Sequence, residues 1–187
     1  MMETNAKLYG DLSRILVTRE EIAEAVAKLG KQITEDYQGK KLMMVGILKG
    51  AIVFFADLLR EIDLPVMTEF MAVSSYGAST KTSGVVNLVK DITKDITGMD
   101  VLVVEDIVDS GMTLSYLKKY LSTRGAASIK IVTLLDKPER RRVDLTADYY
   151  CFTIPDEFVV GYGLDYDEKY RNLPDIGVLD PSVYSGE

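Results

Sequence analysis

Residues 101–135 constrain the fold more than any other part of this sequence. The apolar run 101–104 predicts a buried strand, and leucines spaced three and four residues apart between 114 and 121 predict a helix that ends at Gly125. The apolar run 128–135 predicts a second strand. A strand, a helix and a strand in this order require two parallel strands joined by a right-handed crossover. We therefore expect an α/β fold.

The N-terminal part of the sequence adds elements of the same kind. Thr18 and Glu21 form a capping-box pattern at the start of an amphipathic helix. The apolar run 42–48 predicts a strand covered on both faces, and 66–73 predicts another strand. Between these strands we expect a helix that buries five apolar residues: Ile52, Phe55, Ala56, Leu59 and Ile62. The pattern predicts an open, mainly parallel twisted sheet flanked by helices.

Two segments are expected to lie outside this sheet. Residues 74–84 are rich in glycine and hydroxyl side chains without a buried-side period, which predicts a mobile loop that could act as a lid. Residues 143–187 contain short strand-like runs and turns, which predict a small hood over the strand ends. The length of 187 residues fits one domain, so we assign residues 1–187 to a single domain.

The composition excludes several kinds of chemistry. The chain has no histidine, which rules out Ser-His triads, Cys-His dyads and most zinc sites. Its formal net charge of -7 argues against extended nonspecific binding of nucleic acid. The single cysteine, Cys151, lies between Tyr150 and Phe152 and is expected to be a buried thiol in a strand. Acid-base chemistry therefore has to rely on carboxylates, lysine or tyrosine.

The sequence also favours a cytoplasmic protein. Apolar runs stop well before the ~20 residues that a membrane span needs. Residues 1–11 lack the basic start and apolar stretch of a signal peptide. We expect no membrane partner.

The segment between the strand at 101–104 and the next helix carries the candidate ligand site. Glu105 and Asp106 follow the strand, at the edge where open α/β sheets bind ligands. Such a pair can bind a cation or sugar hydroxyls, although a solvated strand end is the alternative. Asp109 to Thr113 then opens a helix, where a glycine and free N–H groups favour a phosphate. N-capping of the helix is the alternative for the side chains of this stretch.

The sequence VLVVEDIVDSGMTL at 101–114 resembles the signature with which type I phosphoribosyltransferases bind phosphoribosyl pyrophosphate (PRPP). The resemblance implies that Glu105 and Asp106 hold the ribose hydroxyls and Mg²⁺. It also implies that Asp109 is the general base that manages the purine N7 proton. The 5-phosphate is expected on Ser110, Gly111, Met112 and Thr113. This motif is shared by purine and pyrimidine enzymes, so it does not indicate which nucleobase is the acceptor.

Four further segments resemble the hypoxanthine-guanine branch of that family: Leu48-Lys49-Gly50, Ser74-Ser75-Tyr76-Gly77, Leu135-Asp136-Lys137 and residues 155–174. This resemblance implies that Lys49, Gly50 and Arg171 bind pyrophosphate, with a Lys49-Gly50 peptide that can be cis. It also implies that Ser75 and Tyr76 belong to the lid. The purine is expected on Lys137 at the 6-oxo group, Phe158 by stacking, Val159 by its backbone, and Asp165 near the exocyclic group and a second metal.

Two of the purine residues have a plainer alternative as well. Lys137 could be a surface charge, and Phe158 could be a core aromatic. The basic run Arg140-Arg141-Arg142 is expected in a solvated or intersubunit loop.

The resemblance implies purine salvage, in which PRPP and hypoxanthine or guanine give IMP or GMP and pyrophosphate. A homodimer or homotetramer is expected, and nucleic acid is not expected as a partner. Two rival functions remain open: a noncatalytic nucleotide-sensing regulator with the same fold, and a transferase for xanthine or another oxopurine.

Overall fold

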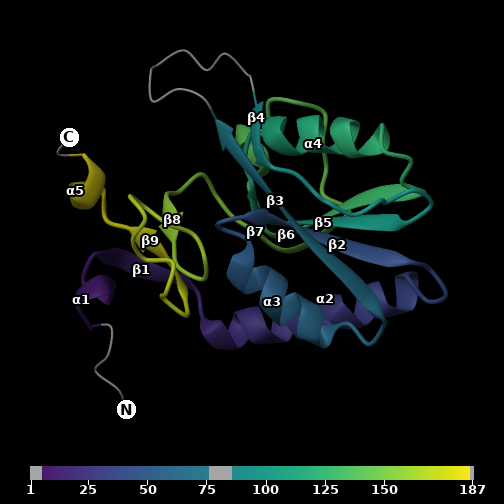
Figure 1. The fold of residues 1–187 in the computed structure, drawn as a ribbon. Helices are drawn as coiled ribbons and strands as arrows, with labels where there is room; N and C mark the ends of the chain where they lie inside the picture. Colours follow the sequence, from purple (N-terminus) through teal and green to yellow (C-terminus); the bar gives the residue numbers. More distant parts are fainter. Residues whose placement is uncertain (1–5, 76–85, 186–187) are drawn as a thin grey trace.

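The computed structural model describes residues 6–75 and 86–185, and a six-stranded sheet forms its centre (Figure 1). The strand order is β4-β3-β2-β5-β6-β7, with β4 antiparallel to β3 and the other neighbours parallel. The strands are β2 (Leu42–Leu48), β3 (Val66–Ser75), β4 (Val86–Lys90), β5 (Asp100–Val108), β6 (Ser128–Asp136) and β7 (Tyr149–Thr153). The expected α/β fold with a mainly parallel sheet is confirmed.

Helices cover both faces of this sheet (Figure 1). Helices α2 (Arg19–Asp36) and α3 (Ile52–Glu61) lie on one face and α4 (Met112–Ser122) on the other. In β2, Leu42 and Met44 pack into the core under α2 and α3, whereas Met43 and Val45 pack into the core under α4. The alternation explains why the whole run is apolar: a strand between two helical layers is buried on both sides.

The helix boundaries follow local signals in the sequence. The Thr18 hydroxyl accepts the Glu21 backbone N–H at 3.3 Å, and the Glu21 carboxylate accepts the Thr18 N–H at 2.8 Å, so the predicted capping box starts α2. The predicted buried face of α3 was partly wrong. Phe54, Phe55 and Leu58 are the buried residues of this helix, while Ile52 is 50% exposed. The buried face is rotated relative to the predicted one. The adjacent apolar residues Val53, Phe54 and Phe55 are compatible with more than one buried face of the helix.

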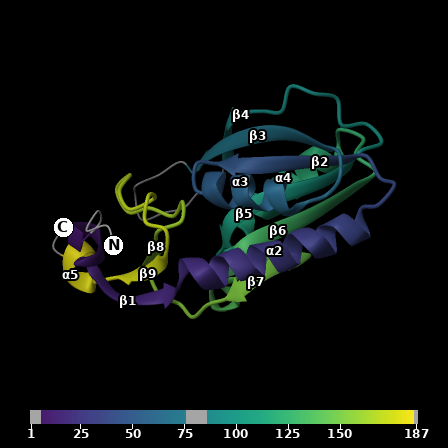
Figure 2. The same cartoon turned by 90° about the horizontal axis from the view of Figure 1, so that it is seen from below.

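A smaller antiparallel sheet forms the hood to one side of the main sheet (Figure 2). It contains β1 (Leu12–Val17), β9 (Ile176–Leu179) and β8 (Val159–Val160), in that order. The short helices α1 (Ala6–Tyr9) and α5 (Pro181–Tyr184) lie beside it (Figure 2). The C-terminal segment therefore supplies most of the hood, as expected, but the N-terminal β1 completes it. Residues 149–153 belong to the main sheet instead.

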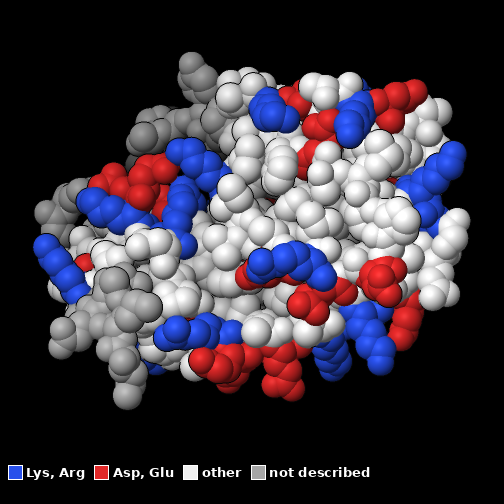
Figure 3. Space-filling view, turned by 60° about the horizontal axis from the view of Figure 1, so that its bottom comes forward, with Lys and Arg blue, Asp and Glu red and all other residues white. Residues whose placement is uncertain are grey.

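Three further observations concern the cysteine, membrane-spanning helices and the surface charge. Cys151 lies in β7, and burial raises the pKa of its thiol to about 12, in agreement with an unreactive strand residue. No helix in the described ranges is long and apolar enough to cross a membrane. On the face drawn in Figure 3, basic side chains are interspersed with acidic ones and separated by uncharged surface.

Candidate active site

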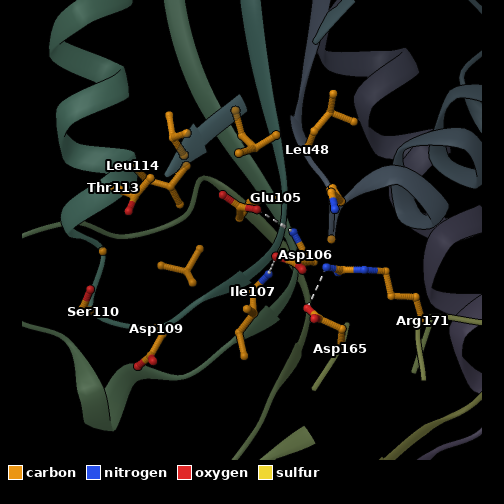
Figure 4. A pocket seen from close by; sticks show the side chains of 16 residues that line it. Leu48, Glu105, Asp106, Ile107, Asp109, Ser110, Thr113, Leu114, Asp165 and Arg171 are labelled. Atoms are coloured by element: carbon orange, nitrogen blue, oxygen red, sulfur yellow. Dashed lines mark hydrogen bonds and ion pairs between the residues drawn. The ribbon is translucent and has the colours of Figure 1, made fainter. Parts of the chain in front are cut away.

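A cavity of about 340 Å³ opens where β2 and β5 end, beside each other in the sheet (Figure 4). From β2 the chain crosses through α3 to β3, and from β5 it crosses through α4 to β6 on the opposite side. The strand order thus reverses between β2 and β5, which is the position where open α/β sheets bind ligands. Ten predicted site residues line the cavity: Lys49, Gly50, Glu105, Asp106, Asp109, Ser110, Gly111, Thr113, Asp165 and Arg171.

The acidic pair occupies the last part of β5 and does not lie in a loop after it, which corrects the predicted strand end at residue 104. Glu105 accepts the Asp106 backbone N–H at 3.3 Å, and Asp106 accepts the Ile107 N–H at 2.8 Å. Burial and the neighbouring Asp106 carboxylate raise the pKa of Glu105 well above its ordinary range. Burial also raises the pKa of Asp106, although hydrogen bonds and Arg171 oppose this effect. Two such carboxylates are favoured when a cation or hydroxyl donors compensate them.

The start of α4 has no side-chain cap from its N-cap residue. Gly111 is the N-cap with φ +76° and offers no side chain to cap the helix. The nearest side-chain acceptor is the Ser110 hydroxyl, 3.4 Å from the Met112 N–H. Gly111 and Thr113 at the start of α4 line the cavity, and the positive end of a helix dipole favours an anion there. Asp109 is not the N-cap, so the capping alternative for this residue was wrong.

The opposite wall of the cavity carries two cations from distant parts of the chain. Lys49 follows β2, in a backbone whose cis non-proline peptide joins Leu48 to Lys49 rather than Lys49 to Gly50. Arg171 pairs with Asp165 at 2.9 Å and donates to the Gly163 carbonyl at 2.8 Å. Glu168 lies between the two cations, 3.0 Å from Lys49 and 3.6 Å from Arg171. Sequence reasoning missed this carboxylate, which occupies a position between two groups that could bind an anion.

Three predicted purine residues, Lys137, Phe158 and Val159, lie outside the lining of this cavity. Lys137 is 5% exposed, and its ammonium group donates to the Glu157 carbonyl at 2.8 Å. It is therefore not a surface charge. Phe158 is 42% exposed, with Tyr166 and Tyr184 against its ring, so it is not a core aromatic either. Val159 is buried in β8, and Met112 starts α4 without lining the cavity.

Two residues of the predicted solvated or intersubunit run, Arg140 and Arg141, also contact the site, while Arg140 and Arg142 are exposed as a solvated run would be. Arg140 Nε lies 3.4 Å from Asp109 Oδ1, and Arg141 donates to the Asp109 carbonyl at 2.7 Å. Arg141 also pairs closely with Asp136 at the end of β6. No signal in the sequence distinguished these contacts from a solvated basic run, because they depend on how the turn after β6 folds back.

The predicted lid can be described only in part. Ser75 ends β3, whereas Tyr76 and the rest of the loop to residue 84 lie outside the described residues.

Comparison with known proteins identifies the family. Residues 15–167 match the phosphoribosyl transferase domain family. The chain is 57% identical over 178 residues to the hypoxanthine-guanine phosphoribosyltransferase of Streptococcus pneumoniae, covering 95% of this chain and 99% of that protein. The corresponding Bacillus subtilis protein is 53% identical over 174 residues, covering 93% and 97%.

A crystal structure of a Staphylococcus aureus hypoxanthine phosphoribosyltransferase superimposes with a TM-score of 0.94 at 50% identity, covering 97% of this chain and 99% of that one. These matches extend over nearly the whole chain, including both sheets and the cavity between β2 and β5. The chain belongs to the phosphoribosyltransferase family, in its hypoxanthine-guanine branch.

Proposed function

We propose that this protein transfers the 5-phosphoribosyl group from PRPP to hypoxanthine or guanine, giving IMP or GMP and pyrophosphate. The observation that carries this proposal is the composition of one cavity. An acidic pair, a helix N-terminus whose N-cap residue is a glycine, and two cations surround it, and these groups match the ribose, the 5-phosphate and the diphosphate of PRPP. The relatives named as hypoxanthine-guanine phosphoribosyltransferases support the choice of base.

Each part of PRPP is bound by a different group of residues. Ser110 to Thr113 bind the 5-phosphate through the start of α4, and Glu105 and Asp106 accept hydrogen bonds from the ribose hydroxyls. Lys49, Gly50 and Arg171 bind the diphosphate from the other wall. An arginine suits this ligand because its forked donors reach two oxygens together. The diphosphate displaces Glu168 from its two cations.

Mg²⁺ fits the same acidic pair. Among the described residues no cluster of three or more potential ligands occurs, so the protein alone does not form a complete metal cage. Mg²⁺ needs only one or two protein carboxylates when water and substrate phosphate oxygens fill its remaining positions. Glu105 and Asp106 would hold it, and the raised pKa of Glu105 indicates a pair that a cation would stabilise. When bound, Mg²⁺ neutralises charge on the leaving diphosphate.

The purine side uses the groups around β6 and the hood. Lys137 donates to the 6-oxo group, Phe158 stacks on the ring, and the Val159 backbone contacts the base edge. Asp165 lies near the exocyclic group, where it also pairs with Arg171. The purine attacks C1 of PRPP through a transition state with oxocarbenium character, and pyrophosphate leaves with inversion. Asp109 accepts the N7 proton of the purine in this step.

Steady-state kinetics with PRPP, Mg²⁺ and each oxopurine in turn test the function. We expect turnover with hypoxanthine or guanine; absence of turnover with any oxopurine would refute an enzyme of this class. Xanthine as the best substrate would favour the closer rival. The regulator rival predicts salt-dependent binding to RNA or DNA, which the mixed surface charge does not favour.

The variant Asp109→Asn tests the proposed general base. We expect the rate of IMP formation to fall by about 10² or more, because a neutral amide cannot accept the proton. Asp144→Asn is the matched control, since Asp144 is exposed and lies outside the cavity lining. A near-normal rate in Asp109→Asn would remove this residue from the role.

The assembly and the location of the protein are further parts of the proposal. The resemblance to the family favours a homodimer or homotetramer in the cytoplasm. Sedimentation equilibrium of the purified protein tests the subunit number.

A further inference from the structure

Four charged residues form a chain that joins the two halves of the site. Arg140 Nε lies 3.4 Å from Asp109 Oδ1, and Arg140 Nη1 lies 3.5 Å from Asp156 Oδ1. The same Asp156 oxygen lies 3.5 Å from the Lys137 ammonium nitrogen. Asp109 and Lys137 are the proposed general base and the proposed donor to the purine. Arg140 is therefore one ion pair away from the first and, through Asp156, two ion pairs away from the second.

The contact with Arg140 leaves Asp109 with one held oxygen and one free oxygen. Oδ1 is buried and makes no hydrogen bond, so the ion pair with Arg140 is its main partner among the described residues. The Asp109 side chain is nevertheless 44% exposed, so its exposed surface lies on its remaining atoms, which include the other carboxylate oxygen. In Figure 4 the Asp109 carboxylate points away from Glu105, Asp106 and Arg171. One oxygen is thus fixed by a cation while the other is available to a substrate proton.

The neighbouring residue holds the backbone at the same position. Arg141 donates to the Asp109 carbonyl at 2.7 Å and pairs with Asp136. Arg140 belongs to the short helix η1 (Pro138–Arg140), which directly follows Lys137. The turn after Lys137 therefore contacts Asp109 at two points: Arg141 binds the Asp109 carbonyl, and Arg140 pairs with the Asp109 carboxylate.

We propose that Arg140 is a positioning residue, which orients the Asp109 carboxylate towards the purine and couples it to Lys137 through Asp156. This inference rests on the proposed roles of Asp109 and Lys137. Arg140 and Asp156 have side chains that are 49% and 47% exposed, so solvent weakens both pairs. The expected effect on turnover is accordingly modest, about three- to fivefold.

Steady-state kinetics of Arg140→Ala test this proposal. We expect kcat for IMP formation to fall about three- to fivefold with an unchanged KM for PRPP, because orientation of the base acts in the transition state. Arg140→Lys keeps a cation near Asp109 and should recover part of the loss. Arg142→Ala is the control with the same charge change, since Arg142 is exposed and its side chain makes no ion pair among the described residues.

A double variant separates action through Asp109 from other effects. If Arg140 acts through this carboxylate, Arg140→Ala adds almost no further loss of kcat in the Asp109→Asn background. A full additional loss, an increased KM for PRPP, or identical kinetics of Arg140→Ala and Arg142→Ala would overturn the inference. The same kinetics distinguish failure of this inference from failure of the proposed role of Asp109. A normal rate of IMP formation in Asp109→Asn would show that Asp109 is not the general base. A low rate in Asp109→Asn together with a normal rate in Arg140→Ala would remove only the role of Arg140.

Discussion

Substitution of Gly50 by alanine should disable the cavity through a single methyl group. Gly50 follows the end of β2 and contacts the acidic pair of β5. A Cβ at this position would lie 2.6 Å from Asp106 Cγ and closer still to Asp106 Oδ2. Ordinary contacts between carbon atoms are about 3.5–4.0 Å, so the Asp106 carboxyl group has to move by about 1 Å.

The size of the effect follows from that displacement. A misplacement of about 1 Å at a reacting centre can cost about 10²-fold in rate, and we expect a loss of this order in kcat/KM for PRPP. Overpacking of a well-packed site costs about 1–3 kcal/mol of unfolding free energy. In a domain of this length, each kcal/mol corresponds to about 2–4 °C in Tm. Gly50→Ala should therefore fold and melt a few degrees lower, yet be nearly inactive.

Gly39→Ala provides the control for this measurement. Gly39 has φ +75° and no atom within 4 Å of an added Cβ, so alanine introduces backbone strain without a steric clash. It should lower the Tm by a few degrees and leave kcat/KM for PRPP unchanged. Thermal melts and IMP-formation kinetics of both variants compare the two effects. A Gly50→Ala enzyme within threefold of the parent kcat/KM, or a loss shared equally with Gly39→Ala, would refute the argument.

Three further predictions test other parts of the structure. Thr18→Ala should lower the unfolding free energy by about 1 kcal/mol in denaturant titrations without affecting kcat. The Thr18 hydroxyl accepts the Glu21 N–H whatever the charge of Glu21, so this part of the difference persists in acid. The hydroxyl also donates to the Glu21 carboxylate and helps to lower its pKa, so the part of the difference that depends on this contact is present above the ordinary glutamate range and lost as the pH falls through the lowered value; a difference that does not shrink in acid would contradict the contact between the hydroxyl and the carboxylate. Glu168→Gln should lower the inhibition constant of pyrophosphate by up to about fivefold, because a competing carboxylate leaves Lys49 and Arg171; weaker inhibition would show that Glu168 does not compete. Because the pKa of Glu105 is raised, protons should compete with Mg²⁺, and the Mg²⁺ concentration for half-maximal rate should rise as the pH falls towards the raised pKa of this carboxyl group. Mg²⁺ titrations of Glu105→Gln should lose this dependence, and a parent enzyme with no such dependence would argue against metal binding at the pair.

Much of the fold was predictable because its signals are local. The strand-helix-strand unit, the capping box of α2 and the apolar run of β2 each depend on periodicity within one segment. Placement of the site at the carboxyl edge followed from the rule that open α/β sheets bind ligands beyond the carboxyl ends of their strands. The PRPP motif was local as well, since Glu105 to Thr113 form one continuous stretch between β5 and α4.

The missed features depend on contacts between distant segments. β1 joins β9 across almost the whole chain, so no window of sequence assigns it to the hood. The orientation of α3 depends on the shape of the core that it covers, and the three adjacent residues Val53, Phe54 and Phe55 leave that choice open. Arg140 becomes part of the site only because η1 turns back towards Asp109.

The register of two strands explains why Asp109 and Lys137 belong together. In the β5·β6 pair Asp100 lies opposite Ser128 and Val108 opposite Asp136, a constant separation of 28 residues. Asp109 and Lys137 are the residues that directly follow the two strands. The Lys137 N–H donates to the Val108 carbonyl at 2.9 Å. Backbone hydrogen bonds between β5 and β6 thus place the proposed base and the proposed purine donor side by side at the end of the sheet. Side chains such as Arg140 and Asp156 then need only orient two groups that the register has already brought to the same edge, which is why weak, half-exposed ion pairs are sufficient for that task.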